Sequence, residues 1–465
     1  MKRLILIFSA VTLSVIYFSC ANQIPPSGGE DDRIPPEIVS VIPKQGTVNF
    51  KGNNIVFRFS EYVDHRSFEE SFYISPLPGK KMDFSWRGKE VEAEFSKALE
   101  KNRTYVVTIG KELKDIRGNS VTGQPYVYAF STGPVLDKGK IEGKVYTKMN
   151  ERLKIFAYFD QNEISDTLNP ENSKPDFVTQ TDEKGNYVFS NLPDGYFRLF
   201  AVTDDDRNNR FSKLTDKIFL TDSDIYLSPD SAEYSGADFM MIENFAGKNT
   251  KNIIKDLKPD SSGFIFSNIT EDFSYIPPAY KFIFYFSNTA VSKSAIVNNI
   301  SITDTADGKS YKLIYNWIND SLLEIIPQEK FSYSSVIKTV VDLSSTSAKT
   351  RYTRFLKIPG NNAFSGVSGR IISRDKIDFP VYVILTSTGN NFISYSQKIK
   401  DTLNFSFEKV IEGNYTLFSF IDKNDNGVFD EGNYSPVVYT EKFYLYDKEI
   451  KVKGGWDTGN IFIRY

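Results

Sequence analysis

The chain has very few residues that could build a redox, zinc or nucleophilic active site. Among 465 residues there is one cysteine, Cys20, and one histidine, His65. A single cysteine excludes an intramolecular disulfide, and a single histidine excludes any site that needs two imidazoles. A Ser-His-Asp triad or a Cys-His dyad would have to use His65. That residue follows the apolar stretch 55–59 within a polar segment, so we expect it in a solvated strand-end loop.

Other absences narrow the possible functions further. The sequence contains no GxGxxG, Walker A, GxSxG or HExxH pattern. A formal net charge of −3 provides no reason to expect nucleic acid as a partner. We therefore expect no catalytic residues. A hydrolase that uses a distant pair of acidic residues stays open, because such pairs are not contiguous in sequence.

The chain is rich in the residues that fill β-sheet cores. It contains 38 Phe and 27 Tyr, and 40% of its residues are hydrophobic. Its length exceeds what one hydrophobic core supports, so three or four domains are expected. This composition also argues against disorder.

The N-terminus has the pattern of a bacterial lipoprotein signal. Lys2 and Arg3 precede the apolar run 4–18, and the small residue Ser19 stands before Cys20. The pattern predicts a signal peptide over 1–19 and a lipid on Cys20, whereas an ordinary cleaved secretory signal is the alternative. Residues 20–36 are rich in proline and glycine and predict an extended tether. The lipid would hold the mature chain on a membrane without a transmembrane helix.

Two kinds of segment each occur twice, which predicts tandem β-sandwiches. The stretch Ile55–Glu61 returns at 282–288, and each copy is followed by a short strand and then a strand with a tryptophan, Trp86 or Trp317. Short strands rich in Val, Ile, Phe and Tyr with frequent turn signals indicate antiparallel sandwiches. A second kind of unit pairs 143–145 with 369–371, and 195–201 with 413–419.

We therefore predict an all-β protein with the layout A-B-A′-B′. The A units are expected to be Ig-like and the B units prealbumin-like. The predicted domain bounds are 37–134 (A), 138–245 (B), 248–360 (A′, the more divergent copy) and 363–465 (B′).

The residues after Cys20 resemble a known family. The string Cys20–Gly29, then 35–39 and 59–63, resembles the Ig-like domain lipoproteins of the Bacteroidota, which begin with an SbsA-type bacterial Ig-like domain. The B units, with Gly143 and the stretch 181–187, resemble the prealbumin-like carboxypeptidase regulatory domain. The resemblance implies a lipid-anchored protein of the outer membrane, on either the periplasmic or the surface face. The family carries no catalytic residues to transfer.

One loop has the spacing of a calcium site. Asp422, Asn424 and Asn426 supply oxygen atoms at positions 1, 3 and 5, the Val428 carbonyl falls at position 7, and Asp430 at position 9. The pattern predicts calcium bound by these five residues. A hairpin turn built from Asx and glycine conformations without metal is the alternative. The counterpart loop at 204–212 has Arg and Ser where the first has Val and Asp, so a metal-free acidic turn is expected there.

These observations predict a non-catalytic, lipid-anchored scaffold, adhesion protein or accessory subunit of an envelope complex. The expected partners are the membrane, through lipid on Cys20, and an envelope protein. A glycan-binding surface lipoprotein is the alternative, and it would need exposed aromatic rings. We expect Trp86, Trp317 and Trp456 in sandwich cores instead. No cofactor other than calcium is indicated.

Overall fold

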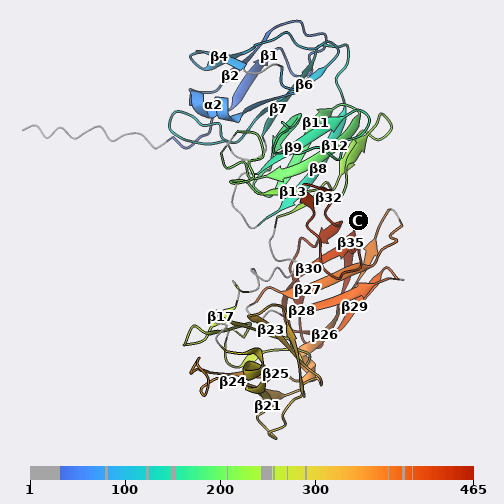
Figure 1. The fold of residues 1–465 in the computed structure, drawn as a ribbon. Coiled ribbons are helices and arrows are strands. Elements are labelled where there is room, and N and C mark those ends of the chain that lie inside the picture. Colours follow the sequence, from blue (N-terminus) through green and yellow to red (C-terminus); the bar gives the residue numbers. More distant parts are fainter. Residues whose placement is uncertain are drawn as a thin grey trace, which may run out of the picture.

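The computed structural model is an all-β chain, as the sequence predicts (Figure 1). Cys20 and most of the tether at 20–36 lie outside the residues that the structure describes. The described residues are 32–78, 82–121, 125–147, 153–206, 208–241, 254, 257–269, 271–287, 291–374, 376–389, 393–400 and 402–465.

The first sandwich packs a sheet of order β1-β2-β5-β4 on a sheet of order β3-β6-β7. Every second residue of β2 and β5 is buried, so their alternating sequences place one face of each strand in the core. A short helix, α2 (His65–Ser71), joins the sheets, and its Phe68 packs in that core. The strands are β1 (Ile38–Ile42), β2 (Asn54–Phe59), β3 (Phe72–Ser75), β4 (Met82–Arg87), β5 (Glu90–Phe95), β6 (Thr104–Ile109) and β7 (Tyr126–Ser131).

The second sandwich packs β10-β9-β12-β13, with β14 also paired to β12, on β11-β8-β15, with β16 also paired to β8. The pairings of β15 and β16 with β8 are parallel. The strands are β8 (Gly139–Tyr146), β9 (Lys154–Asp160), β10 (Phe177–Gln180), β11 (Asn186–Leu192), β12 (Gly195–Val202), β13 (Ile218–Leu220), β14 (Ile225–Leu227), β15 (Glu233–Ser235) and β16 (Phe239–Met240).

The third sandwich packs β17-β18-β20-β23-β22 on β19-β25-β24-β21. It also contains a short helix, α4 (Lys293–Asn298). The strands are β17 (Lys258–Pro259), β18 (Ile265–Ser267), β19 (Ser274–Tyr275), β20 (Phe282–Phe286), β21 (Ile300–Asp304), β22 (Leu313–Trp317), β23 (Leu322–Pro327), β24 (Ser335–Asp342) and β25 (Arg351–Ile358).

The fourth sandwich packs β29-β26-β35 on β28-β27-β30-β33, with β34 also paired to β30. A 3-10 turn, η1 (Asn361–Ala363), leads into it. Its strands and a separate hairpin, β31-β32, are β26 (Phe364–Ile372), β27 (Val381–Ser387), β28 (Ser394–Ile399), β29 (Asn404–Ile411), β30 (Gly413–Ile421), β31 (Asn433–Tyr434), β32 (Val437–Val438), β33 (Phe443–Leu445), β34 (Ile450–Val452) and β35 (Thr458–Arg464).

The sheet orders of the sandwiches correspond in pairs. The path β2-β5-β4 of the first sandwich matches β20-β23-β22 of the third, and β3-β6-β7 matches β21-β24-β25. The path β10-β9-β12-β13 of the second matches β28-β27-β30-β33 of the fourth. In that second pair, β14 and β34 take the same additional place, on β12 and β30 respectively.

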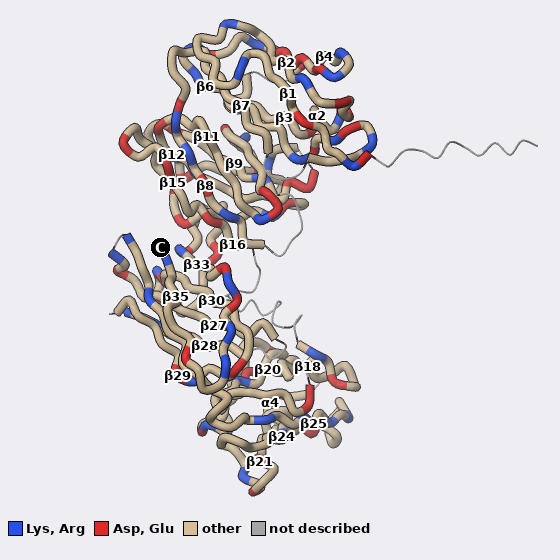
Figure 2. Tube along the Cα trace, turned by 180° about the vertical axis from the view of Figure 1, so that it is seen from behind, with Lys and Arg blue, Asp and Glu red and all other residues tan. Residues whose placement is uncertain are grey.

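The order of the sandwiches in space differs from their order in the chain. Figure 1 shows the first sandwich at one end, then the second, the fourth and finally the third at the other end. In the view of Figure 2, segments with Lys or Arg and segments with Asp or Glu are interspersed along the described part of the chain.

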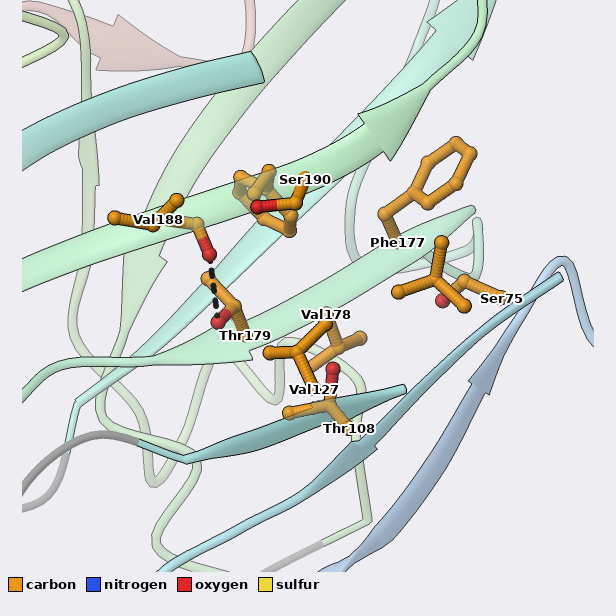
Figure 3. A pocket seen from close by; sticks show the side chains of 10 residues that line it. Ser75, Thr108, Val127, Phe177, Val178, Thr179, Val188 and Ser190 are labelled. Carbon is orange, nitrogen blue, oxygen red and sulfur yellow. Dashed lines mark hydrogen bonds between the residues drawn. The ribbon is translucent and has the colours of Figure 1, made fainter. Parts of the chain in front are cut away.

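Each junction between neighbouring sandwiches is packed. The third and fourth share one continuous buried cluster, which includes Phe284 and Leu417, whereas the first and second have separate cores. Between the first and second lies a cavity lined by Ser75, Thr108 and Phe177, among others (Figure 3). The space open to the centre of a water molecule is ≈ 10 Å³, about enough for one water.

Candidate functional site: two equivalent acidic loops

The predicted calcium loop lies directly after β30, and its backbone forms a tight turn. Asp425 and Gly427 have positive φ angles of 57° and 75°. Glycine adopts this conformation without steric cost, which lets the loop reverse. Asp422 is fully buried at the start of the loop, where its carboxylate accepts the backbone N–H groups of Asn426 at 3.1 Å and of Gly427 at 2.8 Å.

The structure brings the four predicted ligand side chains into one hydrogen-bonded loop: Asp422, Asn424, Asn426 and Asp430. The Asp430 carboxylate accepts hydrogen bonds from the side-chain amides of Asn424 at 2.6 Å and Asn426 at 3.2 Å. The Val428 backbone N–H donates to Asn426 Oδ1 at 2.6 Å, while the Val428 side chain is exposed. This is an Asx-type turn, in which the amide oxygen atoms of Asn424 and Asn426 accept backbone N–H groups. Carboxylate and amide oxygen atoms are also ligands that suit a hard cation.

Sequence spacing missed a further carboxylate at this loop. Glu441 is buried beside it, and its two oxygen atoms accept the backbone N–H groups of Lys423 at 2.7 Å and Asp430 at 3.1 Å. Burial raises the pKa of Glu441 to about 7, and the negative charges of Asp430 and Asp422 contribute. Glu441 lies beyond the twelve positions of a calcium loop, so local spacing could not reveal it.

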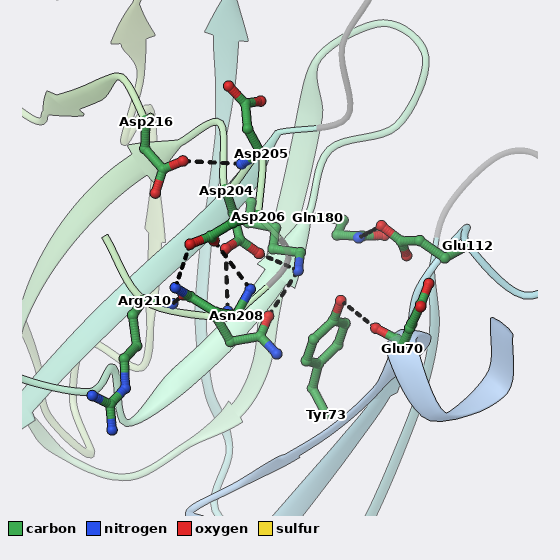
Figure 4. A network of polar contacts seen from close by, with 12 residues as sticks. Glu70, Tyr73, Glu112, Gln180, Asp204, Asp205, Asp206, Asn208, Arg210 and Asp216 are labelled. Atoms are coloured by element: carbon green, nitrogen blue, oxygen red, sulfur yellow. Dashed lines mark hydrogen bonds and ion pairs between the residues drawn. The ribbon is translucent and has the colours of Figure 1, made fainter. Parts of the chain in front are cut away.

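The equivalent loop of the second sandwich carries the denser carboxylate cluster. Carboxylate oxygen atoms of Asp204, Asp206 and Asp216 all lie within 4.8 Å of one another. The ammonium of Lys154 pairs with buried Asp204 and donates to Asn209 Oδ1 at 2.7 Å. The side chain of Lys154, in β9, therefore supplies a positive charge to this loop. Figure 4 shows the surrounding polar network.

The lysine has no counterpart in the fourth sandwich. Lys154 pairs across the sheet with Val202, two residues before Asp204. At the equivalent place, Tyr382 pairs with Phe420, two residues before Asp422. Among the described residues Asp422 makes no ion pair, and Lys398 pairs with the neighbouring Asp425. Asp422 is thus a fully buried carboxylate that, within the described part of the chain, is bound by backbone N–H groups.

A third carboxylate cluster joins distant parts of the first sandwich. Oxygen atoms of Asp32, Glu61 and Asp115 lie within 4.8 Å of one another. Burial raises the pKa of Glu61, and Asp115 and Asp32 contribute to the shift. The Arg117 guanidinium lies 3.0 Å from Asp32 Oδ2 and supplies the opposite charge.

His65 occupies a different element from the one predicted. It is the first residue of α2 and not part of a loop, because the Asp64 side chain accepts the Ser67 backbone N–H at 2.7 Å and caps the helix. The His65 ring stacks on Trp86 at 3.9 Å between centroids. This contact places the imidazole flat against the indole, as a packing contact at the start of α2.

The three tryptophans differ in exposure. Trp86 and Trp317 are half-buried, and the ring of Trp317 lies 5.1 Å below the ammonium of Lys293, the first residue of α4. Both indoles are therefore covered by the first residue of the neighbouring helix. Trp456 is 75% exposed, so the prediction that it lies in a core is wrong. It stands on a tight turn between β34 and β35, where the backbone leaves its side chain no sheet to pack on.

The match to a known family covers the first sandwich. Residues 32–132 match the family model of the bacterial Ig-like domain. The predicted Ig-like nature of the first unit is thereby supported, whereas the predicted lipid on Cys20 lies outside the described residues. No helix in the described part of the chain combines the length and apolar character needed to cross a bilayer.

Comparison with curated proteins returned no match. Among solved structures, the surface layer protein SbsC (domains 1–6) is 9% identical over 90% of this chain and 68% of that chain, with a TM-score of 0.19. The major pilin subunit of Bacillus cereus is 10% identical over 70% and 99%, with a TM-score of 0.16. L,D-transpeptidase 3 of Mycobacterium tuberculosis is 11% identical over 22% and 39%, with a TM-score of 0.16. This chain thus spans less than half of that enzyme, and TM-scores this low do not establish a shared overall arrangement.

Proposed function

We propose that the chain is a non-catalytic protein of the cell envelope that acts as a scaffold, adhesion protein or accessory subunit and is anchored by lipid on Cys20. The observation that supports this role is the end-to-end packing of four β-sandwiches into an elongated molecule, in which the first described residue, Asp32, contacts the first sandwich. Such an array separates its far end from its anchor. We place the domain bounds at 37–134, 138–245, 248–360 and 363–465, and the anchor in the outer membrane.

Crosslinking and affinity capture from intact envelopes test this role. We expect the wild-type chain to fractionate with the outer membrane and to recover one stoichiometric envelope protein. The control Cys20→Ala should lose both. Recovery of the wild-type chain in the soluble fraction, with the same partners as the control, would contradict the anchored scaffold.

Glycan binding is a second candidate, and Trp456 is the observation that favours it. An indole that is 75% exposed on a tight turn offers a stacking face to a sugar ring. We expect Trp456→Ala to abolish retention on immobilised envelope polysaccharide. The matched control is Leu214→Ala, which removes a 99% exposed apolar side chain elsewhere and should leave retention unchanged. Equal retention of both variants and wild type would exclude Trp456 as the binding residue.

We further propose that the loop at 422–430 holds calcium, with Glu441 as an additional ligand. The supporting observation is the fully buried Asp422, which has Tyr382 at the position where Asp204 has Lys154 and makes no ion pair with any described residue. A buried carboxylate is costly unless an opposite charge or several hydrogen bonds compensate for it. Two Asp, two Asn, one carbonyl and one Glu form an oxygen set of the kind that calcium prefers.

Thermal unfolding with and without calcium tests the site. Because a ligand that binds only the folded chain stabilises it, calcium should raise the Tm of the wild type, and EDTA should reverse the effect. Asp430→Asn should lose most of this shift. Asp425→Asn changes a carboxylate of the same loop that pairs with Lys398, and it should keep the shift. A wild-type Tm that does not respond to calcium would rule the site out.

A further inference from the structure

The equivalent loops differ most in the segment that connects each of them to the next strand. In the second sandwich, only residues 213–215 separate Ser212 from Asp216, which lies just before β13. In the fourth sandwich, residues 431–440 stand between Asp430 and Glu441, which lies just before β33. The longer segment contains the hairpin β31-β32. We call residues 431–440 the strap.

The strap leaves its own sandwich and packs on the second one. Tyr434 lies with its ring 4.9 Å from that of Phe211, edge to face, and its hydroxyl donates to Glu171 Oε1 at 2.8 Å. Val437 and Tyr439 pack against the cluster that includes Phe200. This cluster lies on the outer face of the sheet β10-β9-β12-β13, which the strap therefore shields from water.

A buried arginine completes the contact. Arg198 is 1% exposed and makes two hydrogen bonds to Asp224, of 2.8 and 2.7 Å. Its Nη2 also donates to the hydroxyl of Tyr439 on the strap at 2.8 Å. The equivalent residue in the fourth sandwich is Thr416. Of these two sandwiches, the arginine is thus present in the second, on which the strap docks. The strap and its arginine are thus both specific to this junction.

The base of the strap is closed by hydrogen bonds. The Asp430 carbonyl accepts the Glu441 backbone N–H at 3.0 Å and the Thr440 hydroxyl at 3.0 Å. The strap therefore projects in a fixed direction from the fourth sandwich. Beside it, Tyr146 of the second sandwich packs edge to face on Phe443 of the fourth at 5.8 Å, which adds a second point of contact.

We propose that the strap is an intramolecular clamp whose docking partner is the second sandwich of the same chain. Sandwiches that follow each other in sequence usually stack in that order, because short connections keep neighbours adjacent. Here the fourth sandwich docks on the second and moves the third to the far end (Figure 1). The clamp thus sets the order 1-2-4-3 and holds the two halves of the chain at a fixed distance and angle.

Small-angle X-ray scattering of the full chain tests the clamp. In the first variant, residues 431–440 are replaced by the Lys-Leu-Thr of 213–215, the segment that connects the equivalent strands of the second sandwich. We expect its radius of gyration and maximum dimension to increase because the two halves separate. The matched control Val438→Ser changes a side chain of the strap that is 52% exposed, and its scattering curve should equal that of the wild type.

A second, milder variant tests the clamp in case the chain with the shortened strap does not fold. Tyr434→Ala combined with Tyr439→Phe removes the ring contact and the hydroxyl that binds Arg198 while leaving the backbone of the strap intact. We expect the same direction of change, and faster hydrogen exchange in β12 and β13. Scattering and exchange identical to the wild type in this double variant would overturn the proposal. So would a wild-type dimer of concentration-dependent mass, since the strap would then dock on a second copy.

Discussion

Charged side chains that are shielded from water in this protein are of two kinds: some form ion pairs, and others are bound by backbone N–H groups. Lys154 and Asp204 neutralise each other, and the same is true of Arg198 and Asp224. Asp238 is half-buried and makes no ion pair with any residue that the structure describes. It lies between β15 and β16, where its Oδ1 accepts the Lys144 backbone N–H at 2.8 Å. Burial raises the pKa of Asp238 from 3.8 to about 6, against the opposing effect of Lys144.

The pKa of Asp238 predicts a pH dependence of stability. Its folded pKa lies above its unfolded value, so its contribution is complete below about pH 3.8 and is lost as the pH rises to about 6. Asp238→Asn should remove this loss and raise the free energy of unfolding at pH 7 by up to about 3 kcal/mol. Urea unfolding followed by hydrogen exchange in β8, at several pH values, measures the effect. Exposed Asp83→Asn is the control, and equal pH slopes for all three proteins would contradict the prediction.

At this scale the sequence predicts the turn at 422–430 but not its surroundings. Alternating oxygen side chains before a glycine predict the tight turn, and the structure has one. Glu441 reaches its loop from the segment before β33, and Lys154 reaches the other loop from β9, so the local spacing of loop residues cannot predict them. Comparing the repeated units position by position could have found Glu441, because Asp216 stands at the same distance before the matching strand.

At the scale of elements, alternating sequences predicted the strands well and the helices not at all. The stretches 55–59 and 282–286 lie in β2 and β20. The helices α2 and α4 were not predicted because each has less than two turns, which is too short to show an apolar periodicity. Their only signals are single capping residues, Asp64 and Ser292.

The repeated glycine of the B-type units has a steric role that can be tested. A Cβ added to Gly143 in β8 would lie 2.0 Å from the Ala237 carbonyl oxygen, and one added to Gly369 in β26 would lie 2.2 Å from the Ile461 carbonyl oxygen. Both glycines allow the closing parallel strand to approach. We expect Gly143→Ala to lower the free energy of unfolding by about 1–3 kcal/mol, as overpacking does.

Equilibrium urea unfolding measures this loss. The matched control is Gly459→Ala in β35, where an added Cβ would lie 3.6 Å from Ser368 Oγ, an ordinary contact distance. Stability of Gly143→Ala equal to that of the control would show that β8 can shift without cost, and would remove the steric explanation.

At the scale of the whole molecule, sequence could not predict the spatial order of the sandwiches. The repeats indicate how many units there are and what each contains. Their order in space depends on the strap, whose tyrosines are distant in sequence from Phe211 and Arg198. The composition of the Tyr-rich stretch 434–446 predicts an aromatic strand surface, and the structure shows that it is in part the contact surface between two sandwiches.

The distribution of hydrophobic cores predicts how the molecule unfolds. The third and fourth sandwiches share one buried cluster, whereas the inter-sheet cores of the first and second are separate. Leu417→Ala truncates a fully buried side chain of the shared cluster, on the fourth sandwich, and should cost about 2–5 kcal/mol. Because the core is continuous, we expect amides in β24 of the third sandwich to lose the same free energy of exchange.

Leu199→Ala provides the matched control, since Leu199 is the fully buried equivalent in β12 of the second sandwich. Its truncation should lower the free energy of exchange in β12 and leave β6 of the first sandwich unchanged, because their cores are separate. Native-state hydrogen exchange at increasing denaturant reports both effects in one experiment. If Leu417→Ala left β24 unchanged, the third and fourth sandwiches would unfold independently, and their shared cluster would be a contact between two cores and not a single cooperative one.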